Sequence, residues 1–168
     1  MGATLQDADE EMLVNPLDLI EQIVLAHDWP FDRTSEREIA AEVSGRWCDY
    51  RLYFSWREDV QALHFTCAFD VRVPLEKSKE VHSLLAMINE KLWLGHFDLW
   101  TEEGLPLFRH ALLLRGTSGL AVEQMEDLVD IAITESERFY PAFQYVVWGG
   151  KSPQEAMASS ILETVGEA

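Results

Sequence analysis

The sequence predicts one α+β domain with an antiparallel sheet of about five strands, in the element order α-β-β-β-α-β-β-α-α. Three observations support this fold class. Several segments repeat apolar residues at helical spacing, and two regions alternate apolar with polar residues as strands do. Tight turns in the first of these regions would bring the apolar residues of three strands to one face. A chain of 168 residues is long enough for one such domain with a hydrophobic core.

The first predicted element is a helix that begins at Pro16, with Asn15 as its N-cap. The residues that recur through it at helical spacing are Leu17, Ile20, Ile23, Val24 and His27. We expect the Trp29-Pro30 pair to end the helix, because a residue before proline is disfavoured in the α conformation. Residues 1–14 are acidic and unpatterned, and we expect a mobile terminus there before a single domain at residues 15–168.

Residues 39–67 predict three antiparallel strands. A two-residue turn at Gly45-Arg46 would place Val43 opposite Cys48, and a turn at Glu58-Asp59 would place Phe54 opposite Leu63. Both registers put the apolar residues of all three strands on one face. A one-residue slip in either turn would destroy that agreement, so the registers support each other.

In these registers, Cys48 and Cys67 lie diagonally on neighbouring strands and both face the core. One interpretation is a redox pair. The other is two small buried apolar residues, which fits the reducing compartment that we expect for this chain.

Residues 76–92 predict a second helix, whose apolar stripe is Val81, Leu84, Leu85, Ile88 and Leu92. A hairpin then runs from Gly95 to Gly116. A turn at Glu103-Gly104 would place Leu99 opposite Phe108, Phe97 opposite His110 and Asp98 opposite Arg109. Asp98 and Arg109 would form a cross-strand ion pair, which contributes little to stability when it is exposed.

A long third helix completes the predicted core, with Thr117 or Ser118 as its cap. Pro141 should kink or restart this helix, and Gly149-Gly150 should end it. Ser152-Pro153 then caps a short helix over residues 154–164. The run Gly149-Gly150-Lys151-Ser152 ends like a phosphate-binding loop, but it lacks the earlier glycine and follows a helix, so we interpret it as a stop and a cap.

Charge and composition exclude several classes of function. The formal net charge is −17, which would repel nucleic acid and an anionic membrane, so we expect neither as a main partner. The longest apolar run, Ala111–Leu114, is far shorter than the ~20 residues of a membrane-spanning helix. The N-terminal residues lack the basic and apolar segments of a secretory signal, so a cytoplasmic location is the simplest expectation.

Two groups of residues are candidate sites. His96, Asp98 and His110 would suit a metal ion only if they converged, and the predicted register puts His110 on the opposite face. A turn one residue longer would make the two histidines neighbours. The carboxylates of the long helix are a solvated face or a site for a cation or a basic peptide, and we favour the first; they are Glu123, Glu126, Asp127 and Asp130.

Three tryptophans are the candidate contacts for a partner. Trp93, Trp100 and Trp148 fall at element ends or on the less apolar sheet face. Exposed aromatic residues near a polar rim often mark interfaces. Alternatively, each tryptophan packs under a loop or under the last helix.

The chain also resembles a known family. Residues 89–116, with Leu94-Gly95-His96-Phe97 and Phe108-Arg109, and the later run Val147-Trp148-Gly149-Gly150-Lys151-Ser152-Pro153 resemble the YbjN family of bacterial sensory transduction regulators. The resemblance implies a fold like that of type III secretion chaperones, which are small, acidic, cytoplasmic and usually homodimeric, and bind partner polypeptides without chemistry. The family has no established catalytic residues, so the resemblance assigns none.

The expected function is therefore a non-enzymatic, cytoplasmic protein-binding module, regulatory or chaperone-like, that forms a homodimer. We expect no cofactor, no bound metal and no catalytic residue. The alternative is a small-molecule or metal-responsive sensor that uses the hairpin with His96, Asp98 and His110.

Overall fold

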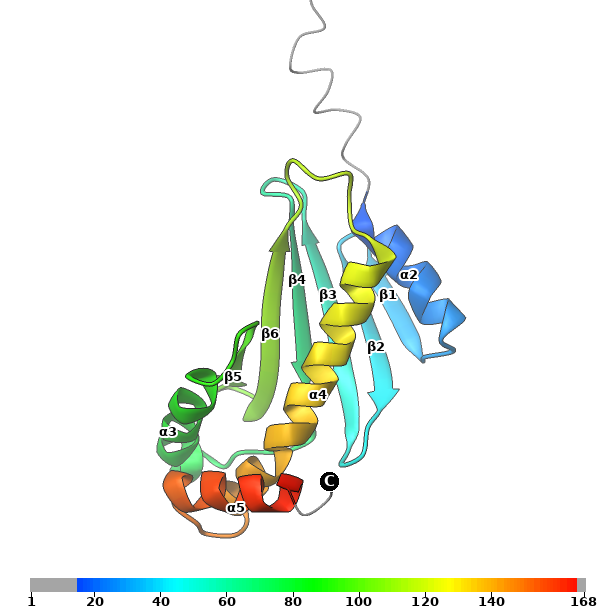
Figure 1. Ribbon diagram of the computed structural model, residues 1–168. Coiled ribbons are helices and arrows are strands. Elements are labelled where there is room, and N and C mark those ends of the chain that lie inside the picture. The colour runs from blue at the N-terminus through cyan, green and yellow to red at the C-terminus, as the bar shows by residue number, and fades with distance from the viewer. Residues whose placement is uncertain (1–14, 166–168) are drawn as a thin grey trace, which may run out of the picture.

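The structure, a computed structural model, describes residues 15–165. The mobile terminus expected at residues 1–14 lies outside this range. The described residues contain one six-stranded antiparallel sheet, in the spatial order β1-β2-β3-β4-β6-β5, and four α-helices (Figure 1). The strands are β1 (Phe31–Ser35), β2 (Glu38–Ser44), β3 (Asp49–Arg57), β4 (Ala62–Ala68), β5 (His96–Trp100) and β6 (Leu105–Leu113). The helices are α2 (Pro16–Ala26), α3 (Ser78–Asn89), α4 (Val122–Val147) and α5 (Pro153–Val165), and a 3₁₀ turn, η1 (Leu75–Lys77), precedes α3.

The helices are segregated to one side of the sheet. Helices α2 and α4 pack on one face, while α3 and α5 pack against α4 at the β5 end (Figure 1). The strands accordingly alternate buried and exposed residues, as in β3, where Tyr50, Leu52, Phe54 and Trp56 are buried. No helix among the described residues covers the other face, which we call the open face. The predicted α+β class and antiparallel sheet are confirmed.

The start of α2 is confirmed. The Asn15 side chain accepts a hydrogen bond from the Leu17 N–H at 3.0 Å, and Pro16 occupies the first helical position. The Asn15 amide also donates to the Glu36 carbonyl at 2.7 Å, which ties the helix to the β1–β2 turn. The helix ends at Ala26, before the Trp29-Pro30 pair, because Asp28 adopts a left-handed conformation with φ 56°.

Each predicted hairpin register is wrong by two residues, and the predicted faces are nevertheless right. Val43 pairs with Tyr50 rather than Cys48, and Phe54 pairs with Phe65 rather than Leu63. The connections span residues 45–48 and 58–61, longer than the two-residue turns expected. Because side chains alternate along a strand, a shift of two residues leaves every side chain on its original face. The burial pattern therefore specifies which face of the sheet each side chain occupies, and the length of the loop decides which residues pair.

The sheet has one more strand than expected. The edge strand β1 pairs antiparallel with β2 and was not predicted, because its polar residues show no alternating apolar pattern. Its Arg33 bonds to Asp18 at 2.9 Å and to Glu21 at 2.7 Å on α2. These ion pairs hold an edge strand that buries few apolar residues against the neighbouring helix.

The β5–β6 hairpin has the third shifted register. Phe97 pairs with Phe108 rather than His110, and Asp98 pairs with Leu107 rather than Arg109. The connection spans residues 101–104, and Gly104 closes it with φ 67° and an N–H bonded to the Trp100 carbonyl at 2.6 Å. Each side chain again stays on its predicted face, so Asp98 and Arg109 share the open face. They form the predicted ion pair at 3.1 Å, although they are diagonal rather than directly paired residues.

Helix α4 differs from expectation at its start and at its proline. It begins at Val122, because the Thr117 hydroxyl donates to the Leu114 carbonyl at 2.7 Å within the loop instead of capping a helix. The Ala121 N–H is bonded to the Gln124 side chain at 2.9 Å. Pro141 lies inside one unbroken helix rather than restarting it. The predicted stop after Val147 and the Ser152-Pro153 start of α5 are confirmed.

An aromatic cluster joins the sheet to α4. Phe69, which follows β4, lies 5.2 to 6.3 Å between ring centroids from four other rings: Tyr50, Phe97, Tyr140 and Phe143. Phe97 in turn contacts Phe108 and Phe139. The edge-to-face and tilted geometries of these contacts are favourable for aromatic pairs. The cluster fixes the position of α4 over the end of β5 and β6.

The cap at Asn15 provides a test of the helix boundaries. Asn15→Ala should lower the free energy of unfolding by about 1 to 2 kcal/mol, because it removes the cap of α2 and the bond to Glu36. Thermal and urea unfolding measure the change. Ser118→Ala is the matched control at a cap that the sequence suggested and the structure does not use, with an expected change within about 0.5 kcal/mol. A larger loss at Ser118 than at Asn15 would contradict the boundaries described.

Candidate partner-binding surfaces

The open face of the sheet carries a mixture of aromatic and charged side chains. Tyr53, Thr66, Arg109 and His96 lie in one cross-strand row. The rings of Tyr53 and Trp100 meet with centroids 5.8 Å apart, and Thr66 is only 4% exposed. A hollow of about 270 Å³ lies over this row, with Tyr53, His64, Trp100 and Arg109 among its lining residues. Trp100 is therefore partly covered by its own sheet.

Arg109 is the charged centre of the open face. One of its guanidinium nitrogens donates to Asp98, while its Nε is buried and has no hydrogen-bond partner. An unpaired buried donor costs free energy, so a polar group brought by another molecule would relieve that cost.

A second surface lies where β6 extends beyond β5. Strand β5 pairs with β6 only from Leu105 to Arg109, although β6 continues to Leu113. Gly95 ends the pairing with φ 65°, and the Phe108 ring lies where a Cβ at position 95 would be. Residues 110–113 thus have β4 on one side and no strand on the other, as Figure 1 shows above β5. We call this segment the free β6 edge.

Alternation of hydrogen bonds identifies the unpaired backbone groups of this edge. The Leu114 N–H donates to the Gln61 carbonyl on the β4 side, and the Phe69 N–H donates to the Pro106 carbonyl. Residues 110 and 112 therefore also bond to β4, whereas Ala111 and Leu113 direct their N–H and C=O groups outward. Within residues 15–165, no hydrogen bond engages these outward groups.

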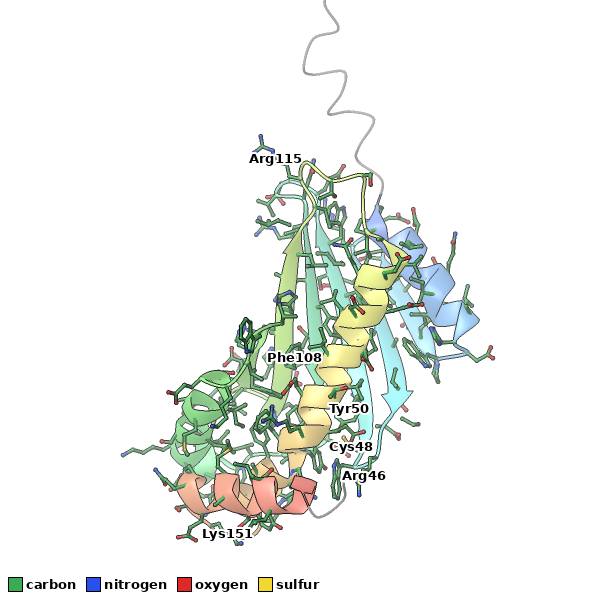
Figure 2. All side chains as sticks on the ribbon, viewed as in Figure 1. Arg46, Cys48, Tyr50, Phe108, Arg115 and Lys151 are labelled. Atoms are coloured by element: carbon green, nitrogen blue, oxygen red, sulfur yellow. The ribbon has the colours of Figure 1, made fainter. Side chains whose placement is uncertain are left out.

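A groove of about 200 Å³ runs beside the free β6 edge, between β6 and the first half of α4. Its walls are mainly apolar, and Figure 2 shows Phe108 on the β6 side. The lining residues are Leu94, Phe108, His110, Leu112, Gln124, Asp127, Leu128 and Ile131. Burial, and then the charge of His96, lowers the pKa of His110, so its imidazole is neutral at pH 7. Asp127 is the one carboxylate in the lining.

Several large apolar side chains are exposed at separate places on the surface. Trp93 is fully exposed, Leu94 is 49% exposed and Leu113 is 75% exposed. Trp148, at the end of α4, is 60% exposed. Of the three predicted contact residues, Trp93 and Trp148 therefore lie at the surface, and Trp93 is next to Leu94 of the groove.

The structure does not bring His96, Asp98 and His110 together. His96 and Asp98 lie on the open face, whereas His110 lines the groove on the helical side of the sheet. Among the described residues, no three His, Cys, Asp or Glu side chains could hold a metal ion. The carboxylates of α4 also form no such group; Asp127 lines the groove, while Glu123, Glu126 and Asp130 are exposed.

The two cysteines are free thiols in a structural setting. Cys67 lies in β4, and burial raises its pKa to about 12. Cys48 precedes β3 rather than lying on it, and burial raises its pKa as well. Beside them, the buried Tyr50 hydroxyl and the Arg46 N–H both donate to Glu137 of α4, at 3.3 and 2.8 Å (Figure 2). This cluster fastens the β2–β3 loop to α4, and its thiols hold their protons at neutral pH.

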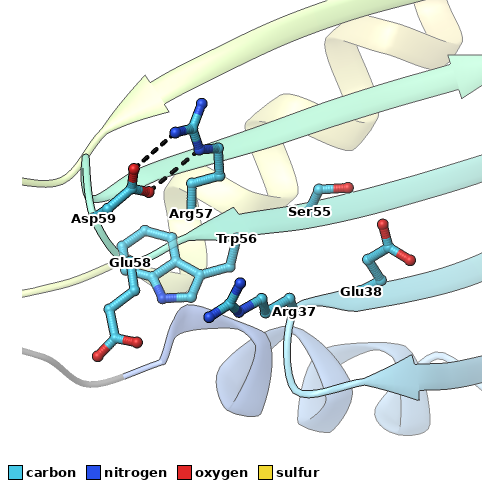
Figure 3. Close-up of a pocket in the computed structure, with 7 residues that line it drawn as sticks. All are labelled: Arg37, Glu38, Ser55, Trp56, Arg57, Glu58 and Asp59. Atoms are coloured by element: carbon cyan, nitrogen blue, oxygen red, sulfur yellow. Dashed lines mark hydrogen bonds and ion pairs between the residues drawn. The ribbon is translucent and has the colours of Figure 1, made fainter.

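A larger hollow, of about 640 Å³, lies beside the start of β2 and the end of β3. Figure 3 shows its seven lining residues, with Arg57 bonded to Asp59 at 2.7 Å. Its two arginines face three carboxylates, so it offers no uniform charge to a ligand. Ser55 pairs with His64 on the adjacent strand, but no hydrogen bond joins their described side chains. The hollow lacks an activated nucleophile.

The run that ends like a phosphate loop is occupied by contacts within the chain. The Lys151 ammonium donates to Ser159 at 2.9 Å and lies 4.4 Å from the Tyr145 ring centroid. The Ser152 hydroxyl accepts from the Glu155 N–H at 3.2 Å, as an N-cap does. The interpretation as a helix stop and cap is confirmed.

The sequence did not predict the free β6 edge or its groove. The edge depends on β5 being shorter than β6, and the groove depends on where α4 crosses the sheet. The available signal was Gly95, which limits the length of β5, together with the uncharged run from Ala111 to Leu114.

Comparison with known proteins identifies the fold. A sequence model of the YbjN family, described as "Putative bacterial sensory transduction regulator", matches residues 16–145. No curated protein sequence matches the chain. The crystal structure of YbjN, "a putative transcription regulator from E. coli", is similar with a TM-score of 0.52 and 15% sequence identity, covering 73% of this chain and 87% of that one. None of the described helices has the length and apolar character to cross a membrane.

The free β6 edge makes a prediction for backbone amide exchange. The N–H groups of Ala111 and Leu113 point outward without a partner, so they should exchange with solvent much faster than those of His110 and Leu112, which bond to β4. Hydrogen–deuterium exchange followed by NMR at single residues measures the four rates. Equal protection at all four positions in a monomeric sample would show that the edge is covered.

Proposed function

The chain belongs to the YbjN family of bacterial regulators, and we propose on this premise that it is a non-enzymatic cytoplasmic regulatory module that binds a partner protein. The observation that supports the proposal most is the exposed apolar pair of Trp93 and Leu94, of which Leu94 lines the groove. Large apolar side chains are rarely gathered in water without a binding partner, and tryptophan is enriched at the centres of interfaces.

A role without catalysis agrees with the chemistry of the described side chains. Burial holds the pKa of Cys67 and of Tyr140 at about 12, which leaves both groups protonated and poor nucleophiles at neutral pH. Free thiols at Cys48 and Cys67 agree with a reducing compartment, which supports a cytoplasmic location.

The module is proposed to be a homodimer that packs through its open face. Arginines and carboxylates are interleaved there: Arg51, Arg57 and Arg109 lie among Asp32, Glu38, Glu42, Asp49 and Asp98. A two-fold arrangement can place the arginines of one copy against the carboxylates of the other, and so reduce the repulsion between chains of net charge −17. The buried, unpaired Nε of Arg109 would gain an acceptor from the second copy.

The alternative of a metal-responsive sensor is not favoured. It needs His96, Asp98 and His110 on one face, and the hairpin register separates His110 from the other two.

The exposed tryptophan gives the test of partner binding. Tagged protein should recover a specific partner from the native cytoplasm, and Trp93→Ala should reduce that recovery roughly tenfold, because interface tryptophans contribute most to affinity. Quantitative mass spectrometry measures the recovery. Leu75→Ala is the matched control, because Leu75 is also 82% exposed but lies away from the groove. Repeated recovery of the protein alone, under gentle conditions, would count against the proposal.

The homodimer has its own test. Sedimentation at micromolar concentration should give twice the chain mass of 19.2 kDa. Arg51→Glu should weaken the dimer roughly tenfold, because it adds a like charge to the open face. Arg115→Glu, the same charge change in the loop after β6, should leave the dimer intact. A monomer in both wild type and variants would rule out this assembly.

A further inference from the structure

We propose that the free β6 edge binds an extended, basic and apolar segment of a partner protein as an added strand, with alternate side chains in the groove beside α4. This inference rests on the proposed function and deepens it, because it names the site and the chemistry of the partner. The proposed dimer uses side chains of the open face, whereas this inference uses the backbone edge of β6 and the groove on the helical side of the sheet.

The backbone of the edge is prepared for a strand. Ala111 and Leu113 present two N–H and two C=O groups outward in the geometry of an antiparallel ladder. Strand β5 already occupies the same side of β6 from Leu105 to Arg109. An added segment would continue in line with β5, where Gly95 turns the chain away.

The edge lacks the features that usually prevent such pairing. Exposed edges in soluble proteins carry charged residues, proline or bulges that block the addition of another strand. Residues 110–113 read His-Ala-Leu-Leu, with neither a charged nor a proline residue, and the His110 imidazole is neutral at pH 7. The edge strand at the opposite side of the sheet, β1, carries Asp32 and Arg33.

The groove supplies contacts for side chains. An added strand would point every second side chain toward α4, into the space lined by Leu112, Leu128 and Ile131. Apolar residues at those alternate positions would bury surface that is now in water. Trp93 and Leu94 would cover the end of the segment nearest β5.

Charge decides between the two candidate occupants. Helix α4 carries six carboxylates and no lysine or arginine between Val122 and Glu137, and one of them, Asp127, lines the groove. A second copy paired along this edge would bring two such helices together, and their like charges would repel. A partner segment with lysine or arginine beside its apolar residues would instead be attracted.

The experiment selects short peptides from a displayed random library on the full-length protein. Selected sequences should alternate apolar residues and contain lysine or arginine. Their binding should protect the Ala111 and Leu113 amides from exchange, whereas the His110 and Leu112 amides should change little. N-methylation of the peptide bonds that face β6 should weaken binding at least about tenfold, because it removes ladder hydrogen bonds without changing side chains.

Two pairs of variants separate backbone from charge. Ala111→Pro removes one outward N–H without breaking a bond to β4 and should weaken binding roughly tenfold, whereas Ala111→Val keeps the N–H and should bind normally. Asp127→Lys should weaken the basic peptides similarly, whereas Asp130→Lys, which makes the same charge change outside the groove lining, should have a smaller effect. Circular dichroism and thermal unfolding confirm that each variant is folded, and N-methylated peptides replace Ala111→Pro if it does not fold.

Three outcomes overturn the inference. The first is that selection enriches no peptide. The second is that a selected peptide binds folded Ala111→Pro as tightly as wild type, or that its N-methylated form binds as tightly as the unmodified peptide. The third is that Ala111→Pro loses a dimer that the wild type forms. The last outcome would assign the edge to a second copy. The pull-down separates this inference from the proposed function. If Ala111→Pro and Asp127→Lys recover the native partner as wild type does, strand addition is wrong and partner binding stands.

Discussion

The packing of Phe69 against four other rings is the interaction on which the rest of the structure depends. Phe69 follows β4, and its neighbours come from β3, β5 and α4, so one side chain connects three parts of the fold. Aromatic rings bury large areas and constrain the angles at which they meet. This cluster fixes where α4 crosses the sheet. The width of the groove at the free β6 edge follows from that position.

Segregation of the helices to one side gives the protein two surfaces of different character. The open face is polar and mixed in charge, and it is centred on Arg109 and the Tyr53–Trp100 pair. The free β6 edge is apolar, lies beside an acidic helix and presents unpaired backbone groups. Two contacts are proposed for these surfaces, one with a second copy of the chain and one with a partner protein. Here the first contact would rely on side-chain charge, and the second on the backbone ladder.

Much of the fold was predictable from the sequence, because apolar periodicity and caps are local. Asn15-Pro16 predicted the start of α2, and Gly149-Gly150 predicted the end of α4. The alternation of side chains along the strands predicted that Asp98 and Arg109 share one face. The errors arose where distant contacts decide the structure. Strand β1 is held by ion pairs of Arg33 rather than by an apolar pattern. The groove could not be predicted, because it depends on how α4 lies across β6, and no local signal specifies that placement. Trp93 is exposed, which is one of the two alternatives that the sequence left open, and its neighbours in the groove were not predicted.

The hairpin connections of this sheet have a consequence for how such a chain can vary. Each of the three predicted hairpins has a four-residue loop where a two-residue turn was expected. Every side chain nevertheless lies on the face of the sheet that was predicted for it. A change of two residues in a loop can therefore shift the pairing without moving any side chain to the other face, whereas a single inserted residue must be absorbed by the loop or by a bulge to avoid exchanging interior for exterior along a strand. Loop length can thus drift in even steps under weak selection. Two descendants could then share a core and a binding edge while their aligned sequences had become difficult to match.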